Sequence, residues 1–178
     1  MSQRHSEYAR KPGDCYVTPP WVWEALYSVE PWARTAFDCA PEHGGYDFLA
    51  DWAIFQNLAT NPPYGKLAEK FVRHALDLPA KVNFAFLLPH AWDAAKGRVD
   101  LFKDQRFKCK HTLVERIRWA NLEQKPAGPS TNHAWYVWRA EPRGFIKPAM
   151  GWLEFRPMAE GVPALPAVFG SRRYAPHE

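Results

Sequence analysis

Apolar and polar positions divide the chain into a series of short elements. Apolar side chains recur at helical spacing over residues 22–29, and Pro31 lies just beyond them, which predicts a first helix. Thr18 is placed to act as the N-cap of this helix, with Pro19 at its first helical position. Residues 35–39 form a short apolar segment that predicts a buried strand.

The middle of the chain predicts a strand, a helix and a second strand in succession. Residues 58–60 indicate a short strand, and apolar side chains at helical spacing over residues 67–75 mark a helix that ends before Pro79. Residues 82–88 are almost continuously apolar, as in a parallel strand that is covered on both faces. This succession is typical of an α/β sheet.

The carboxyl-terminal half predicts paired strands. Residues 94–103 are compatible with a helix, and residues 121–131 contain the prolines and glycine of a loop. Apolar alternation over residues 112–119 predicts a strand, with residues 133–139 as its hairpin partner, and residues 152–155 predict one more short strand. The order of elements predicts an α/β sheet with an antiparallel hairpin at its edge.

Composition restricts the class of protein. The chain has 178 residues, 47% of them apolar, which fits one domain with a core at about residues 14–140 and a proline-rich extension at residues 141–178. No apolar run approaches the roughly 18 residues of a membrane-spanning helix, and residues 1–11 show no secretory signal, so we expect a cytoplasmic protein without membrane contacts. The three cysteines and seven histidines are dispersed, which predicts neither a disulfide framework nor a metal site.

The most informative chemistry lies in the sequence Asn61-Pro62-Pro63-Tyr64. Two consecutive prolines make a rigid loop, and this loop follows a predicted strand, where open α/β sheets place their ligands. Asn61 offers a carbonyl acceptor and Tyr64 a flat face, which together suit a planar amino group. The ordinary structural interpretation is a proline-rich turn, which Asn-Pro dipeptides often form.

These residues resemble the catalytic loop of methyltransferases that use S-adenosylmethionine to methylate amino groups, and most closely that of the phage-type DNA adenine-N6 methyltransferases. The resemblance covers about residues 14–139 and implies a Rossmann-like class I methyltransferase sheet. Besides the catalytic loop, the similar stretches are Asp14-Cys15-Tyr16-Val17-Thr18-Pro19, Phe37-Asp38-Cys39-Ala40, Phe86-Leu87-Leu88-Pro89, Arg116-Ile117-Arg118-Trp119 and Asn132-His133-Ala134-Trp135.

The resemblance implies roles for individual residues. The Asn61 Oδ1 atom and the Pro62 carbonyl would accept the two amino protons of the target base, and Tyr64 would stack on the base after it is flipped out of the duplex. Contacts to S-adenosylmethionine would come from Tyr16, Thr18, Pro19, Asp38 and Asp51. Further candidates for its ribose and adenine are Asp47, Phe48 and Trp52, although exposed turn residues and core aromatics explain these residues equally well.

The cofactor half of the predicted sheet is short. Asp38 and Asn61 are only 23 positions apart, whereas a parallel strand-helix-strand unit takes about 30 residues or more. At least one crossover has therefore been reduced to a loop or lost. The sequence Ala40-Pro41-Glu42-His43 also stands where the family has a glycine-rich loop.

Basic residues gather between Lys96 and Arg118, where eight Lys and Arg stand against three Asp and Glu. Together with nearby tryptophans, this excess suits a nucleic-acid groove, and a solvated charged face is the alternative interpretation. The expected nucleic-acid contacts are Lys66, Lys96, Arg98, Arg116 and Arg118.

Three functions follow from these features. The first is transfer of a methyl group from S-adenosylmethionine to the N6 atom of adenine in duplex or single-stranded DNA. The second is methylation of another conjugated amino group, in RNA adenine, at cytosine N4 or in a protein glutamine. The third is a degenerate methyltransferase that binds DNA without cofactor. The sequence does not determine the oligomeric state.

Overall fold

Helices and strands alternate along the described part of the chain. The computed structural model describes residues 18–39, 48–50, 57–78, 82–119, 131–142, 144 and 146–154. The elements are α1 (Pro20–Val29), η1 (Pro31–Thr35), β1 (Asn57–Thr60), α2 (Lys66–Asp77), β2 (Asn83–Pro89), η3 (Trp92–Ala94), η4 (Lys96–Arg98), α3 (Val99–Lys103), β3 (Phe107–Leu113), β4 (His133–Trp138) and β5 (Ala149–Leu153), where η marks a 3-10 helix.

The five strands form one mixed sheet in the order β1-β2-β4-β3-β5. Strand β1 pairs parallel to β2 and β5 parallel to β3, whereas β4 runs antiparallel to both β2 and β3. Because β2 and β3 both oppose β4, the carboxyl ends of the other four strands meet at one edge of the sheet. We call this the carboxyl edge; Thr60, Pro89 and Leu113 end their strands there, and His133 begins β4 there.

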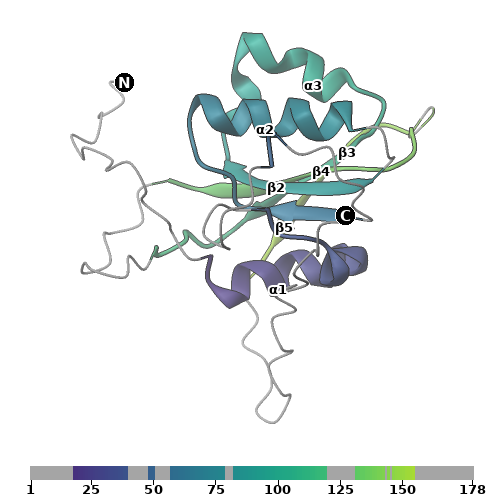
Figure 1. Cartoon of the computed structure of the whole chain (residues 1–178). Coiled ribbons are helices and arrows are strands. Elements are labelled where there is room, and N and C mark those ends of the chain that lie inside the picture. The colour runs from purple at the N-terminus through teal and green to yellow at the C-terminus, as the bar shows by residue number, and fades with distance from the viewer. Residues whose placement is uncertain are drawn as a thin grey trace, which may run out of the picture.

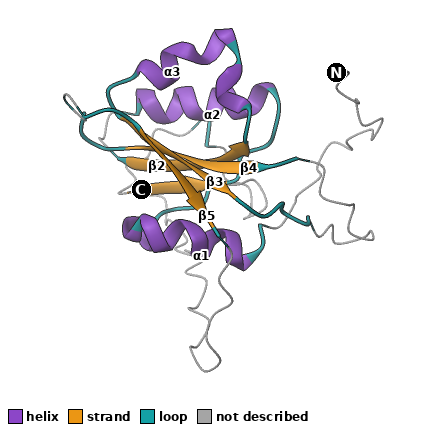
Figure 2. Ribbon diagram, turned by 180° about the vertical axis from the view of Figure 1, so that it is seen from behind, coloured by secondary structure: helices purple, strands orange, loops and turns teal. Residues whose placement is uncertain are grey.

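Helices cover both faces of the sheet, with α1 on one side and α2 and α3 on the other (Figures 1 and 2). The alternation of side chains along β2 explains why both faces are buried. Phe84 and Phe86 belong to the core beneath α2, and Ala85 and Leu87 belong to the core above α1. The predicted α/β class and the prediction that residues 82–88 form a strand covered on both faces are therefore confirmed.

Proline sets both ends of α1, and its start differs from the prediction. The N-cap is Pro19, with φ −58° and ψ 145°, and the helix begins at Pro20, so the expectation that Thr18 caps the helix is wrong. A residue that precedes proline is pushed into the extended region, which prevents Pro19 from being helical. The same effect before Pro31 ends the helix at Val29 and leaves Glu30 with φ −127°.

The strand predicted at residues 112–119 lies five residues earlier, at β3. The apolar pattern of this strand is interrupted by three polar residues, Lys108, Lys110 and His111, so the sequence does not indicate a strand here. Lys110 is nevertheless only 3% exposed, and its ammonium donates to the His90 carbonyl at 2.6 Å and to Asp93 at 2.8 Å. The alternation after Leu113 comes from a chain that has left the sheet.

Other boundaries shift by smaller amounts. The hairpin pair β3–β4 does not form the edge of the sheet, because β5 adds beside β3, and β5 itself is residues 149–153 rather than 152–155. Residues 35–39 form no named strand, and Phe37 instead makes a single parallel bridge to Leu58 of β1. The helix expected over residues 94–103 is two 3-10 turns followed by the short α3.

The helix α2 matches its prediction closely. It buries Phe71, Val72 and Ala75 against the sheet and ends at Asp77, before Pro79. The exception is Leu67, which is exposed. Within the described ranges, no helix is long and apolar enough to cross a membrane.

A substitution of Trp138 tests the packing of the core between the sheet and helices α2 and α3. Its ring stacks on Phe84 with centroids 5.1 Å apart, and its indole nitrogen donates to the Leu101 carbonyl at 3.2 Å. We expect Trp138→Ala to lower the free energy of unfolding by about 3–5 kcal/mol in urea denaturation, because it leaves a large cavity. Trp152, which is 70% exposed, is the matched control, and Trp152→Ala should change the same quantity by about 0.5 kcal/mol or less. Equal losses in the two variants would contradict this description of the core.

Candidate functional site

The loop Asn61-Pro62-Pro63-Tyr64 leaves β1 at the carboxyl edge and leads directly into α2. Gly65 makes the turn between loop and helix with φ 83° and ψ −138°, a conformation that other residues rarely adopt. Asn61 and Pro62 each precede a proline, which favours an extended backbone and keeps the loop from joining the helix. Pro62 is buried, whereas the other three residues are partly exposed. The strand-loop-helix placement predicted for this sequence is confirmed.

Asn61 and Thr18 each carry a buried side-chain oxygen without a protein partner. The Asn61 Oδ1 and Thr18 Oγ1 atoms make no hydrogen bond within the described part of the chain. A buried polar atom left in this state costs about 1–3 kcal/mol, so each requires an explanation. Both residues were predicted from the sequence to bind substrate or cofactor, and a ligand that donates hydrogen bonds would explain both.

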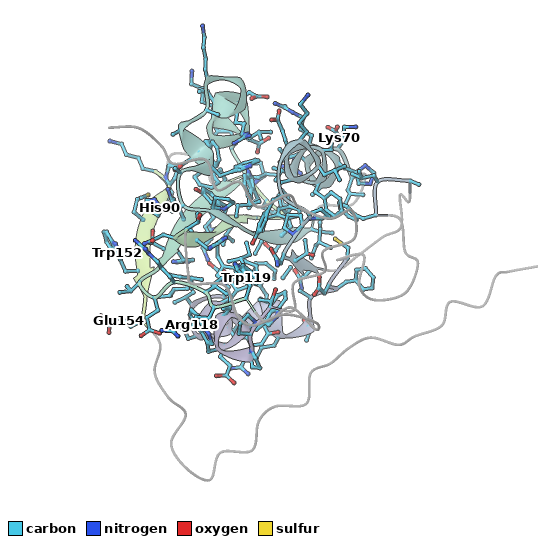
Figure 3. The ribbon with its side chains drawn as sticks, turned by 90° about the vertical axis from the view of Figure 1, so that its left-hand side faces the viewer. Lys70, His90, Arg118, Trp119, Trp152 and Glu154 are labelled. Atoms are coloured by element: carbon cyan, nitrogen blue, oxygen red, sulfur yellow. The ribbon has the colours of Figure 1, made fainter. Side chains whose placement is uncertain are left out.

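Tyr64 is held by two aromatic side chains at the same edge. Its hydroxyl lies 3.2 Å from His133 Nε2, and the two rings are 5.7 Å apart. Trp119 packs edge-on against both, at 6.3 Å from the Tyr64 ring and 5.4 Å from the His133 ring. Figure 3 shows Trp119 in the centre of this side of the molecule. The Tyr64 ring thus has a fixed position while remaining partly exposed.

The first strand segment is fixed to β1 through side chains. The Thr60 hydroxyl donates to Asp38 Oδ1 at 2.7 Å, and Thr60 is completely buried. Main-chain hydrogen bonds join Phe37 to Asn57 and Ala59 at 2.9 and 3.0 Å. Asp38 therefore lies at the carboxyl edge, close to the start of the Asn-Pro-Pro-Tyr loop.

The chain after β2 is also anchored at this edge. The His90 carbonyl accepts hydrogen bonds from the Tyr136 hydroxyl at 2.7 Å and from the Lys110 ammonium. Burial raises the pKa of Tyr136, and the nearby Asp93 carboxylate acts in the same direction. The hydroxyl therefore keeps its proton and donates it to the carbonyl of His90, a residue that Figure 3 labels.

The basic residues predicted to bind nucleic acid fall into two groups. Lys66, Lys96 and Arg118 are exposed, and Arg116 is exposed with its Nε donating to Asn132 at 2.7 Å. Arg98 instead lies 4.4 Å from the centre of the Trp92 ring and donates to Glu69 and to the Trp92 carbonyl.

The wider basic stretch is largely used inside the fold. Lys108 pairs with Glu30, Lys110 with Asp93, and Arg106 with Asp104. Neither a continuous basic groove nor a simple solvated face describes these residues. Among the described residues, Lys66, Arg116 and Arg118 are exposed basic side chains in segments that follow the strand ends at the carboxyl edge.

Several predicted contacts cannot be placed. Tyr16, Asp47, Asp51, Trp52 and the loop at residues 40–43 lie outside the described residues. Phe48 is placed, but it is 1% exposed and packs against Phe71 and His74 at 5.1 and 4.8 Å, so it is a core residue. Pro19 is partly exposed next to Thr18.

The sequence assigned no role to Thr60, and it included Trp119 and His133 only within stretches that resemble the methyltransferase family, although all three shape the site. For His133, the sequence signal for a role in the site was its position at the start of a predicted apolar strand. Trp119 and Thr60 have no such signal, because their roles depend on contacts between distant segments.

No protein-family model matches the chain, and no curated protein matches it. The functional interpretation therefore depends on the residues and geometry of the carboxyl edge.

The environment of His133 predicts a pH dependence of stability. Burial lowers the pKa of His133 to about 4, and a main-chain contact with Thr131 offsets only part of this shift. The unfolded chain takes up this proton near pH 6.5, so it binds more protons than the fold between these values. We therefore expect the free energy of unfolding to fall as the pH is lowered from about 6.5 to about 4.

His133→Gln isolates this effect. The fall in unfolding free energy over that window should be clearly smaller in the variant than in the natural protein, in urea titrations at each pH. Glu30 also contributes at the acid end of this window. Burial acts to raise its pKa, but contacts with His111, Lys108 and Trp32 lower it to about 2, from an ordinary value of 4.5, so only the difference between the two proteins reports on His133. An identical slope in both proteins between pH 6.5 and 4 would contradict the assignment to His133.

Proposed function

We propose that this protein transfers a methyl group from S-adenosylmethionine to the N6 atom of adenine in DNA. The observation that carries the proposal is the Asn61 Oδ1 atom at the carboxyl end of β1, which is buried and has no hydrogen-bond partner among the described residues, within the sequence Asn-Pro-Pro-Tyr. Open α/β sheets bind their ligands at this edge.

The loop is suited to an amino group because it offers acceptors and few donors. Asn61 presents its carbonyl oxygen, and the two prolines have no N–H group that would compete for it. Hydrogen bonds from an exocyclic amino group to Asn61 and to the Pro62 carbonyl would orient its nitrogen, so positioning supplies much of the rate. Tyr64, held by His133 and Trp119, would stack on the base, worth about 1–3 kcal/mol.

Thr18 and Asp38 support a cofactor site beside this loop. Helix α1 leads from Thr18 to Glu30, and Glu30 pairs with Lys108 near the amino end of β3. Thr18 therefore lies at the opposite end of α1, on the side of the carboxyl edge. Its unpartnered hydroxyl and the Asp38 carboxylate fit the donors and acceptors of an amino acid and a nucleoside. When bound, S-adenosylmethionine supplies an electrophilic methyl group on a sulfonium, so the protein needs no covalent nucleophile.

The surface of the carboxyl edge favours a nucleic acid as the acceptor substrate. Lys66, Arg116 and Arg118 are exposed there together with the ring of Tyr64, and phosphate contacts with basic side chains supply affinity without sequence selection. An adenine inside a duplex cannot reach the loop, so it must be flipped out or presented in a single strand.

The direct test compares cofactor binding with methyl transfer. S-adenosylmethionine is titrated calorimetrically into the natural protein and Asn61→Ala, and transfer of a labelled methyl group is then measured on unmethylated DNA, RNA and a glutamine peptide. We expect both proteins to bind the cofactor and Asn61→Ala to transfer methyl to DNA at least about 100-fold more slowly. Asn57→Ala, at the other end of β1, is the control and should retain most of the rate.

Each other outcome has a defined meaning. Transfer to RNA or peptide but not to DNA would assign the site to another amino group. The absence of cofactor binding, with and without DNA, would overturn the enzyme proposal and leave a DNA-binding relative of methyltransferases.

Thr18 provides a second prediction, which separates function from stability. Thr18→Val removes the unpartnered hydroxyl and keeps the shape of the side chain. We expect cofactor affinity to fall about 5- to 10-fold, the value of one lost hydrogen bond, while thermal stability stays equal or rises. Loss of stability with unchanged affinity would instead mean that the hydroxyl serves the fold.

A further inference from the structure

Three metal-ligating side chains meet on the α1 side of the sheet, away from the catalytic loop. The atoms are Glu30 Oε1, Cys109 Sγ and His111 Nε2, and all lie within 4.8 Å of one another. The sulfur is 3.1 Å from the histidine nitrogen and 3.7 Å from the carboxylate oxygen, and these two atoms are 3.5 Å apart. We call these residues the Glu30 cluster.

Local structure brings the cluster together. Cys109 and His111 are two residues apart on β3, so both side chains project from the same face of the sheet. Cys109 belongs to the core that α1 covers, and Glu30 follows α1 directly (Figure 2). The alternating Cys-x-His pattern was visible in the sequence, but the carboxylate comes from a residue 79 positions away.

The distances suit a tetrahedral zinc ion. Zinc bonds of about 2.3 Å to sulfur and about 2.0–2.2 Å to nitrogen and oxygen place the ligand atoms about 3.4–3.6 Å apart. The distances from Glu30 Oε1 to the histidine nitrogen and to the sulfur are within about 0.2 Å of this range. The sulfur and the nitrogen, which are 3.1 Å apart, must separate by a few tenths of an ångström to reach it.

Neighbouring groups orient two of the three ligands. The Trp32 indole donates to the second carboxylate oxygen of Glu30 at 2.6 Å, which leaves Oε1 directed toward the cluster. The His111 ring lies against Gly151 of β5, where a Cβ atom would be only 2.8 Å from Nδ1. Such supporting contacts are typical of metal sites.

Lys108 supplies the positive charge that the buried carboxylate needs. Its ammonium bonds Glu30 Oε1, and Glu30 itself is only 1% exposed. The Lys108 side chain is 28% exposed, so it can turn into solvent when another cation takes its place. A thiolate and a carboxylate together balance the charge of a divalent ion.

We propose that the Glu30 cluster binds a divalent transition metal of the zinc type, with Glu30, Cys109 and His111 as protein ligands. Binding releases the thiol proton of Cys109 to solvent and replaces Lys108 on the carboxylate, and the fourth position is open to water. One thiolate, one imidazole and one carboxylate form a ligand set that zinc accepts. The ion would tie the end of α1 to β3, about 13 Å along the strand from the carboxyl edge. The proposal differs from the expectation based on dispersed cysteines and histidines, and it does not depend on the methyltransferase function.

The test uses Co²⁺ and Zn²⁺ with the purified full-length protein. We expect one equivalent of Co²⁺ to bind and to show thiolate-to-cobalt charge-transfer absorption that Zn²⁺ displaces. Cys109→Ser should lose this absorption, and its Zn²⁺ affinity should fall about 100-fold or more. Cys39→Ser changes the other described cysteine and should bind as the natural protein does.

Lys108→Ala distinguishes a metal site from a buried ion pair. In a metal site the competing ammonium is gone, so Zn²⁺ affinity should rise about tenfold and Zn²⁺ should restore the thermal stability that the variant loses. A variant that is destabilised and not restored by Zn²⁺, or a natural protein that binds neither metal, would overturn the proposal. Charge-transfer absorption that persists in Cys109→Ser would also overturn it.

Discussion

Strand β4 determines where the elements around it lie. It runs against both β2 and β3, which aligns the carboxyl ends of the parallel strands at one edge. Each of its long polar or aromatic side chains also contacts a different neighbouring segment. The contacts run from His133 to Tyr64, from Trp135 to the Val22 carbonyl, from Tyr136 to the His90 carbonyl and from Trp138 to the Leu101 carbonyl. One buried strand thereby positions the Asn-Pro-Pro-Tyr loop, α1, the chain after β2 and α3.

This arrangement also fixes the segments that carry Thr18 and Tyr64. The contact of Trp135 with Val22 fixes the start of α1, close to Thr18, while the contact of His133 fixes Tyr64. The two buried oxygens of Thr18 and Asn61 are then held where no group of the described residues forms a hydrogen bond with them. A buried oxygen without a hydrogen bond costs about 1–3 kcal/mol, and a folded protein tolerates this cost when a ligand offsets it. These two oxygens are therefore stronger support for a ligand site than the loop sequence alone.

The sequence predicted the elements whose pattern is local and missed those that depend on distant partners. Strand β2, helix α2 and the Asn-Pro-Pro-Tyr loop were all placed correctly, because an apolar run, a helical period and a proline pair are visible over a few residues. Strand β3 was misplaced, because the buried Lys110 looks like a surface residue until its partners at His90 and Asp93 are known. The start of α1 was misplaced for a different reason: the steric effect of Pro20 on Pro19 outweighs the capping preference of Thr18.

The central claim is that Asn61 accepts a hydrogen bond from the amino group of a target adenine. It is tested most directly by the NMR signals of the Asn61 carboxamide, assigned with Asn61→Asp, in the presence of S-adenosylhomocysteine and a single-stranded oligonucleotide that contains one adenine. The account predicts that these signals shift with adenine and stay in place when the same position carries N6,N6-dimethyladenine, which has no amino proton to donate. Equal shifts with both bases, or none with either, would contradict it.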